Sequence, residues 1–252
     1  MRCHSTSKFK RPWGIWKPHW RNKENSRIFT YTMLVAILTM AIPYSIINRI
    51  MGNLDRSVID PITPIDSWIP FLAWSSVIYL TLYLYYPIAC YYGIKNDHRI
   101  REMFAFNQVM ITITWIVYLI FILFPTEIYI REEIPIGIRK GEGFWGFWIG
   151  DLMHQIDKPY NAWPSLHIVQ SLMMLMLVRH WKVLSARAEI LAWISWIMLC
   201  ASVMTTKQHF FFDLVTGIIV ALLSWYYLCI PLMNSANSNE WIEKFPDESY
   251  LE

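Results

Sequence analysis

The sequence predicts an all-α, polytopic membrane protein with six transmembrane helices and a short interfacial helix between the third and the fourth. Composition is the first observation: 55% of the 252 residues are hydrophobic and 16% are charged, whereas about 25% are charged in an ordinary soluble domain. Second, the apolar residues form blocks of about 20, long enough to cross a hydrocarbon core of about 30 Å. Third, the blocks are continuous and do not alternate with polar residues, which is typical of helices and not of barrel strands.

Six apolar blocks define the expected helices. They cover residues 28–50, 68–93, 105–124, 164–181, 188–204 and 210–233. We interpret residues 28–233 as one membrane domain, preceded by a basic segment, residues 1–27, and followed by an acidic tail, residues 234–252. The first block is too long for the apolar core of a cleaved signal peptide, so we expect it to remain as a membrane anchor.

The basic residues predict how the chain is oriented. An even number of spans places both termini on one side of the membrane. That side carries 15 Lys and Arg residues, and the opposite side carries 7. Because positive residues favour the cytoplasm, we expect a multi-pass protein with cytoplasmic termini. The starts of the fourth and sixth spans then face the periplasm, a lumen or the exterior.

The long loop at residues 125–163 is expected to lie on that outer side. Loops of this length usually are functional or contain an element of their own. Residues 143–156 are rich in aromatic and aliphatic side chains and are interpreted as a helix in the membrane interface. We take it as an interfacial anchor; the alternative is a lid or entrance for a lipid substrate.

A histidine and an aspartate stand together at the outer end of the sixth span. His209 and Asp213 are four residues apart, so on a helix they share a face, about 6 Å apart along the axis. An ionisable group one turn inside a span is costly and usually functional. A carboxylate on one imidazole nitrogen fixes the tautomer and leaves the other nitrogen free to attack or to bind a ligand. Lys207, just outside, can hold an anion as a point charge.

A second histidine stands at the outer start of the fourth span. Pro164 suits the first position of a helix, so Ser165 and His167 would surround the positive helix end, which binds anions. His167 could protonate a leaving alkoxide. A histidine at a span end is more often an ordinary interfacial residue, but these groups lie at one depth on one face of the membrane. A metal site formed by His167, His209 and Asp213 is a weaker alternative, because the lysines and the helix end suit an anion better.

These two stretches resemble the type 2 phosphatidic acid phosphatase superfamily, most closely the branch of inositol phosphorylceramide synthases and sphingomyelin synthases. The matching residues are Pro164-Ser165-Leu166-His167, in the context Tyr160-Asn161-Ala162-Trp163, and Thr206-Lys207-Gln208-His209 followed by Asp213 and Gly217. The resemblance covers about residues 28–233, and the order and spacing of the paired motifs are specific.

The resemblance implies a role for each catalytic residue. His209 would be the nucleophile that takes the phosphorus, Asp213 would orient it and stabilise its charge, and His167 would be the general acid. Water or an alcohol would then resolve the phosphohistidine, without a metal or another cofactor. Residues 28–233 would be the catalytic domain.

The sequence departs from the wider family in its phosphate-binding residues. Leu166 replaces the common glycine, Val203 replaces an arginine six residues before the nucleophile, and the usual Lys-x6-Arg-Pro element is absent. We therefore expect other residues to bind the substrate, with Arg139, Lys140 and Lys158 as rivals of Arg131. The expected substrate-binding residues are Ser165, Lys207, Arg131, Lys158 and Asn161.

The predicted function is that of a membrane lipid phosphatase, acting on a lipid phosphate or pyrophosphate. The alternative is a phosphotransferase that moves a phospho-headgroup to a lipid alcohol, and a remote alternative is an inactive lipid transport or assembly protein. The expected partners are the membrane and a phospholipid or lipid phosphate, and not a nucleic acid. The sequence does not indicate the headgroup, the tail or the oligomeric state.

Overall fold

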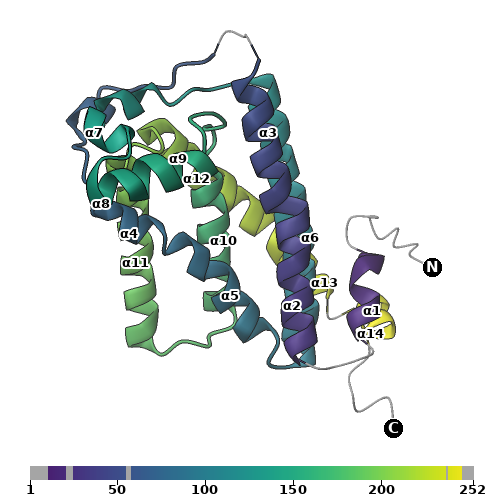
Figure 1. The fold of residues 1–252 in the computed structure, drawn as a ribbon. Helices are drawn as coiled ribbons and strands as arrows, with labels where there is room; N and C mark the ends of the chain where they lie inside the picture. The colour runs from purple at the N-terminus through teal and green to yellow at the C-terminus, as the bar shows by residue number, and fades with distance from the viewer. Residues whose placement is uncertain (1–10, 21–24, 55–57, 237, 246–252) are drawn as a thin grey trace.

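The computed structural model describes residues 11–20, 25–54, 58–236 and 238–245, and the regular elements that these residues form are helices joined by loops (Figure 1). Extended pairing in the described part is limited to two isolated bridges, Ile59 with Thr126 and Glu127 with Tyr160. The all-α prediction is therefore confirmed. Both bridges join loops at the end of the bundle that carries the histidine motifs.

Four helices among the described residues are long and apolar enough to cross a membrane. They are Asn25–Gly52, formed by α2 (Asn25–Ala36), a π-helical turn η3 (Ile37–Ala41) and α3 (Ile42–Gly52); α6 (Asp97–Leu123); α11 (Ala186–Thr205); and Phe211–Ser235, formed by α12 (Phe211–Ser224), a π-helical turn η7 (Trp225–Cys229) and α13 (Ile230–Ser235). These helices coincide with the first, third, fifth and sixth predicted spans, and they indicate an integral membrane protein.

The second predicted span is divided. It forms α4 (Ser75–Tyr79) and α5 (Leu82–Gly93), and a short 3-10 turn, η4 (Asp66–Trp68), precedes them. Ile69 is extended, with ψ of 115°, as a residue before proline prefers. The amide of Leu72 then donates to Thr205 O at 2.9 Å. The helix therefore begins later than residue 68, because Pro70 and the bond from Leu72 to Thr205 hold the preceding chain in a loop.

The fourth predicted span is the short helix α10 (Leu166–His180), which is about 22 Å long. It lies in the middle of the bundle and contacts α5, α6, α11 and α12. Most of its side chains are buried. A Cβ atom on Gly217 of α12 would come within 2.9 Å of Ser165 O and 3.2 Å of Ile168 Cβ. Glycine at this position therefore lets α12 pack directly against the start of α10.

The loop between α6 and α10 contains short helices of its own. It forms η5 (Tyr129–Glu133), α7 (Ile136–Arg139), α8 (Gly143–Trp145), the π-helical η6 (Gly146–Met153) and α9 (His154–Ile156). The segment expected to be an interfacial helix is thus helical from residue 143 to 156. Figure 1 shows α7, α8 and α9 at the same end as the start of α12.

The described parts of the two terminal segments pack against each other and against α6. Trp16, which ends η2 (Gly14–Trp16), stacks on Phe104 with ring centroids 4.8 Å apart. Lys244 Nζ, in α14 (Asn239–Lys244), donates to Pro12 O at 2.8 Å. Figure 1 shows α1 (Lys17–Trp20) beside α14. The predicted boundaries at residues 27 and 233 stay predictions, and residues 1–10, 21–24 and 246–252 lie outside the described residues.

Candidate active site

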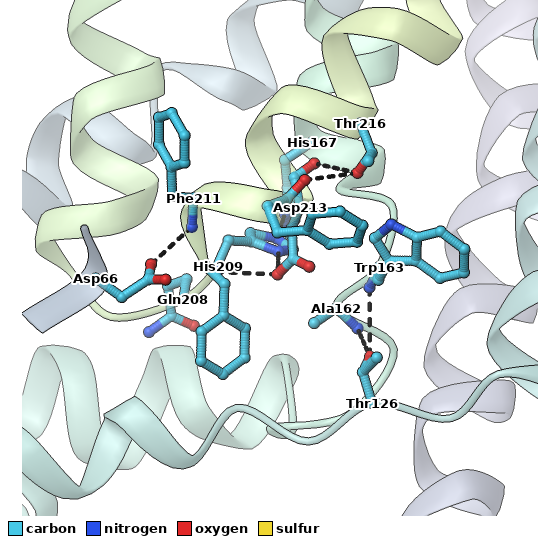
Figure 2. Close-up of polar contacts among 12 residues, drawn as sticks. Asp66, Thr126, Ala162, Trp163, His167, Gln208, His209, Phe211, Asp213 and Thr216 are labelled. Carbon is cyan, nitrogen blue, oxygen red and sulfur yellow. Dashed lines mark hydrogen bonds and ion pairs between the residues drawn. The ribbon is translucent and has the colours of Figure 1, made fainter. Parts of the chain in front are cut away.

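His209 lies in a tight turn between α11 and α12. The amides of Gln208 and His209 both donate to Val203 O, at 3.0 and 3.2 Å, and Lys207 adopts a φ of +55°. This left-handed conformation is uncommon for a lysine and reverses the chain after α11. The turn brings Nδ1 of His209 to 3.4 Å from Asp213 Oδ2 (Figure 2).

The expectation that His209 and Asp213 share a helical face is wrong in one respect. α12 begins at Phe211, so only Asp213 is helical. The same carboxylate oxygen also accepts the Phe210 amide at 3.0 Å. This capping bond at the start of α12 turns the Asp213 carboxylate towards His209, which precedes the helix. Both side chains are buried, His209 at 3% exposed and Asp213 at 0%.

His167 completes a row with these two residues. Its Nδ1 lies 2.9 Å from His209 Nε2. α10 begins at Leu166 with Ser165 as its N-cap, so Pro164 precedes the helix and does not occupy its first position as expected. The Ser165 amide donates to Asp213 O at 3.2 Å, which joins the start of α10 directly to α12.

A fourth group in the row was not predicted. The hydroxyl of Tyr79, at the end of α4, lies 3.1 Å from His167 Nε2. The order along the row is Tyr79, His167, His209 and Asp213. Nothing in the sequence singled out Tyr79, because it is one of fourteen tyrosines and lies inside an apolar block.

Two polar side chains outside the motifs hold the loops that carry the histidines (Figure 2). Thr126 Oγ1 accepts the amides of Ala162 and Trp163, at 2.9 and 3.3 Å, just before α10. Asp66 Oδ1 accepts the amide of Phe211 at 2.7 Å, at the start of α12. Both loops are thus tied to segments far away in the sequence.

Arg131 is buried beside the turn that carries His209. Its Nη1 donates to Asp157 O at 2.8 Å and its Nη2 donates to Gln208 Oε1 at 2.5 Å. The Gln208 amide nitrogen in turn lies 3.3 Å from His154 Nε2. Sequence reasoning named Arg131 but missed Gln208 and His154, which link it to the helical segment at residues 143–156.

His154 makes the stability of the folded protein depend on pH. Burial, with Arg131 close by, lowers the pKa of His154 from 6.5 to about 4. Between these values the unfolded chain binds a proton that the folded protein does not, so stability is full above about pH 6.5 and falls as the pH drops towards 4. We expect wild-type protein in detergent to lose up to about 3 kcal/mol over this range. His154→Gln should lose less, and His98→Gln, at an exposed site far away, should behave as wild type. If the melting temperatures of wild type and His154→Gln fell by the same amount between pH 7 and pH 5, this expectation would be wrong.

The ammonium groups of the two lysines expected to bind substrate have partners outside the row. Lys207 is 1% exposed, and its ammonium contacts Glu133 Oε2 at 2.5 Å and Ile69 O at 2.7 Å. Lys158 Nζ donates to Gln155 Oε1 at 2.8 Å in an exposed position. Neither ammonium bonds to a residue of the row, and their roles in substrate binding stay predictions.

Several buried polar atoms near the motifs have no hydrogen-bond partner within the described part of the chain. They are Ser165 Oγ, both amide atoms of Asn161, Arg131 Nε and Asp213 Oδ1. Unpaired buried polar atoms are rare in folded proteins and indicate a missing partner. Most of these atoms can donate a hydrogen bond, which suits an anionic ligand. For metal binding, no group of three or more His, Cys, Asp and Glu side chains among the described residues is arranged to hold an ion.

A cavity of about 400 Å³ lies directly beside His167. Besides His167, its lining comes from the helix formed by α2, η3 and α3, and from α5, α6, α9 and α10, and is mostly apolar. Ile37 and Tyr83, at 44% and 54% exposed, line it and also face the outside of the bundle. The cavity therefore opens sideways, between η3 and α5.

A larger hollow of about 940 Å³ lies at the opposite end of the bundle. Its buried carboxylate, Glu102, accepts the indole N–H of Trp181 at 2.8 Å and contacts His98 at 3.5 Å and His180 at 3.6 Å. These groups satisfy one another, and none belongs to the paired motifs.

Comparison with known families agrees with the geometry. The family model described as the PAP2 superfamily matches residues 61–227, which includes both histidine motifs. No curated protein and no solved structure matches the chain. Members of this superfamily are generally phosphatases or phosphotransferases. Because the family model covers well over half of the chain, the chain belongs to the PAP2 superfamily.

Proposed function

We propose that this protein is a membrane lipid phosphatase that acts on a lipid phosphate or pyrophosphate through a phosphohistidine at His209. The observation that carries the proposal is the buried row of Asp213, His209 and His167, with contacts of 3.4 and 2.9 Å. A carboxylate on one imidazole nitrogen and a second imidazole beside the other is the arrangement that a histidine nucleophile with a general acid requires.

The row supports a role for each proton. Asp213 accepts Nδ1–H of His209, so His209 Nε2 carries the lone pair that attacks phosphorus. The phosphoryl group enters between His209 Nε2 and His167 Nδ1 and replaces their hydrogen bond. As the P–N bond forms and the P–O bond breaks, protonated His167 gives its Nδ1 proton to the leaving oxygen and becomes neutral. In the second step His167 takes a proton from water, whose oxygen displaces His209.

The phosphate oxygens need donors, and the unpaired buried atoms supply them. The first amides of α10 point out of the helix start, where the helix dipole favours negative charge. Ser165 Oγ, the Asn161 amide and Arg131 Nε add unpaired side-chain groups. Arg131 is held from behind by Gln208 and the Asp157 carbonyl, so we propose it as the main cationic ligand.

We further propose that the bundle crosses the membrane six times, with α4–α5 and α10 completing the four longer helices. The excess of basic residues on the side of the termini supports cytoplasmic termini and an extracytoplasmic active site. The exposed Phe144 and Phe147, at 71% and 59%, support an interfacial position for the helical segment at residues 143–156.

The cavity beside His167 supports a substrate with a hydrocarbon tail. Met33 and Tyr44 both line it and lie eleven residues apart on one helix, which is about 16 Å along its axis. Spread over that length, about 400 Å³ gives a mean cross-section of about 25 Å², which suits one hydrocarbon chain. The sideways opening between η3 and α5 would admit this chain from the bilayer.

A bulky side chain in the cavity should lower kcat/KM for substrates with a long tail more than for substrates with a short one. Ala41 lines the cavity, so Ala41→Phe should exclude part of a long tail. Losing the burial of two methylene groups, at about 0.8 kcal/mol each, corresponds to about a tenfold fall in kcat/KM. Turnover of a short-chain, water-soluble phosphate should stay within about twofold of wild type. Ala201→Phe, at an exposed position of α11 outside the cavity, is the control. Equal effects of Ala41→Phe on long and short substrates would exclude a tail-binding cavity.

Transfer to a lipid alcohol is the second candidate, and the same cavity favours it. It reaches His167 from the membrane side, so an alcohol carried on a hydrocarbon chain could present its hydroxyl to the acid–base residue in place of water. The resemblance to inositol phosphorylceramide and sphingomyelin synthases points the same way.

The test uses detergent-purified protein with a panel of lipid phosphates, pyrophosphates and phospholipids, with and without a lipid alcohol, in EDTA. Free phosphate released without the alcohol is the expected result. A new phospholipid that forms only with the alcohol would establish transfer instead. Inactivity on the whole panel would contradict both enzymatic proposals and favour a lipid transport or assembly protein.

A further inference from the structure

Tyr79 makes the contact that determines which nitrogen of His167 is available for catalysis. Its hydroxyl lies 3.1 Å from His167 Nε2, and its ring meets the imidazole edge to face, with centroids 5.4 Å apart. The tyrosine is 3% exposed, so water does not compete freely for this bond. Both nitrogens of His167 are therefore engaged, Nε2 by Tyr79 and Nδ1 by His209.

The hydrogen-bond directions follow from the far end of the row. Asp213 accepts Nδ1–H of His209, so in neutral His209 the other nitrogen, Nε2, is an acceptor. His167 Nδ1, at 2.9 Å, must then be the donor. In neutral His167 the remaining nitrogen, Nε2, has a lone pair, and it accepts the hydroxyl of Tyr79. In protonated His167 the same nitrogen donates to the phenol oxygen.

A phenol suits this position better than a carboxylate. It can donate as well as accept, so it satisfies His167 Nε2 both before and after proton transfer. A carboxylate could only accept, and it would hold His167 in the protonated state. The phenol also adds no charge to a buried site, where an extra ionised group would be costly.

We propose that Tyr79 is a positioning residue that acts through His167 and keeps its Nδ1 directed at the phosphoryl group throughout the cycle. When His167 gives its Nδ1 proton to the leaving oxygen, Nε2–H stays bonded to Tyr79. When water attacks the phosphohistidine, Nδ1 takes back one proton, and Tyr79 still prevents the ring from turning. This inference rests on the proposed function, because it concerns the general acid of that reaction.

The test compares the effect of Tyr79→Phe on kcat for two substrates whose leaving groups differ in their need for a proton. Tyr79→Phe keeps the ring and removes only the hydroxyl. With a long-chain alkyl phosphate, whose leaving alkoxide must be protonated, we expect kcat to fall about 10- to 100-fold with little change in KM. With 4-nitrophenyl phosphate, whose leaving phenolate needs no proton, kcat should stay within about threefold of wild type. Tyr227→Phe, at a 73% exposed position in η7, should match wild type with both substrates.

A double variant distinguishes an effect of Tyr79→Phe through His167 from a general structural effect of the substitution. If Tyr79 acts through His167, then adding Tyr79→Phe to His167→Ala should lower the residual activity no further. An equal fall with both leaving groups, or a full additional fall in the double variant, would overturn the inference. So would a Tyr79→Phe enzyme as active as wild type on the alkyl phosphate. A wild-type protein that hydrolyses neither ester would instead refute the proposed phosphatase function, and this inference with it.

Discussion

Replacing His209 by alanine is expected to abolish phosphate release. The imidazole supplies the atom that bonds to phosphorus, and the remaining members of the row have other proposed roles, His167 as the general acid and Asp213 as the partner of His209. We expect the steady-state rate to fall at least about 10⁴-fold, which is typical for removal of a nucleophile. The measurement is phosphate release from the best lipid substrate.

The control for this variant must show that the fold persists. His209→Ala leaves the Asp213 carboxylate with the Phe210 amide as its remaining partner, so some loss of stability is expected. His209→Gln fills more of the site and can still hydrogen-bond to the carboxylate, but has no nucleophilic nitrogen. Both variants should elute as wild type does on size exclusion. His98→Ala, at the opposite end of the bundle, should stay active. An active and monodisperse His209→Gln protein would refute the nucleophile assignment.

Asp213→Asn is expected to have the second largest effect. The amide keeps the size of the carboxylate and can still accept the Phe210 N–H. It removes the charge that stabilises the imidazolium, and in the flipped orientation, which gives up the Phe210 bond, its NH2 group donates to His209 Nδ1 and places the ring proton on Nε2. The attacking lone pair is then lost. A comparable change in an Asp–His pair costs about 10⁴-fold, and we expect about 10³- to 10⁴-fold in kcat.

The comparison for Asp213→Asn is an acid outside the row. Asp151 is exposed on η6, so Asp151→Asn makes the same chemical change without touching the motifs and should leave the rate within about threefold. If Asp213→Asn retained more than a tenth of wild-type activity, Asp213 would be only a helix cap and not a partner of His209.

The sequence allowed the helices to be located wherever hydrophobicity alone decides the outcome. The first, third, fifth and sixth blocks match the long helices to within a few residues, except that α6 begins at Asp97 instead of residue 105. Hydropathy does not reveal that polar residues can extend a helix beyond its apolar block, as residues 97–104 do in α6. Nor did it reveal that Pro70 and the bond from Leu72 to Thr205 delay the second helix.

The site was predictable only where residues lie close together in the sequence. His209 and Asp213 stood out because they are four residues apart, and His167 because of its motif. Tyr79 and Asp66 gave no signal, because their contacts with His167 and Phe211 span 88 and 145 positions in the chain. Such contacts depend on the packing of α4 and its preceding loop against α10 and α12, which a single sequence does not reveal.

The central claim is that phosphorus becomes bonded to His209. The most direct test mixes the enzyme with a lipid phosphate, stops the reaction with alkaline denaturant within one turnover, and maps the peptides by mass spectrometry. The account predicts the added mass of one phosphoryl group on His209, stable in alkali and lost in acid, and absent from His209→Gln. Full substrate turnover with no phosphorylated histidine in any quenched sample, or with the label on another residue, would contradict it.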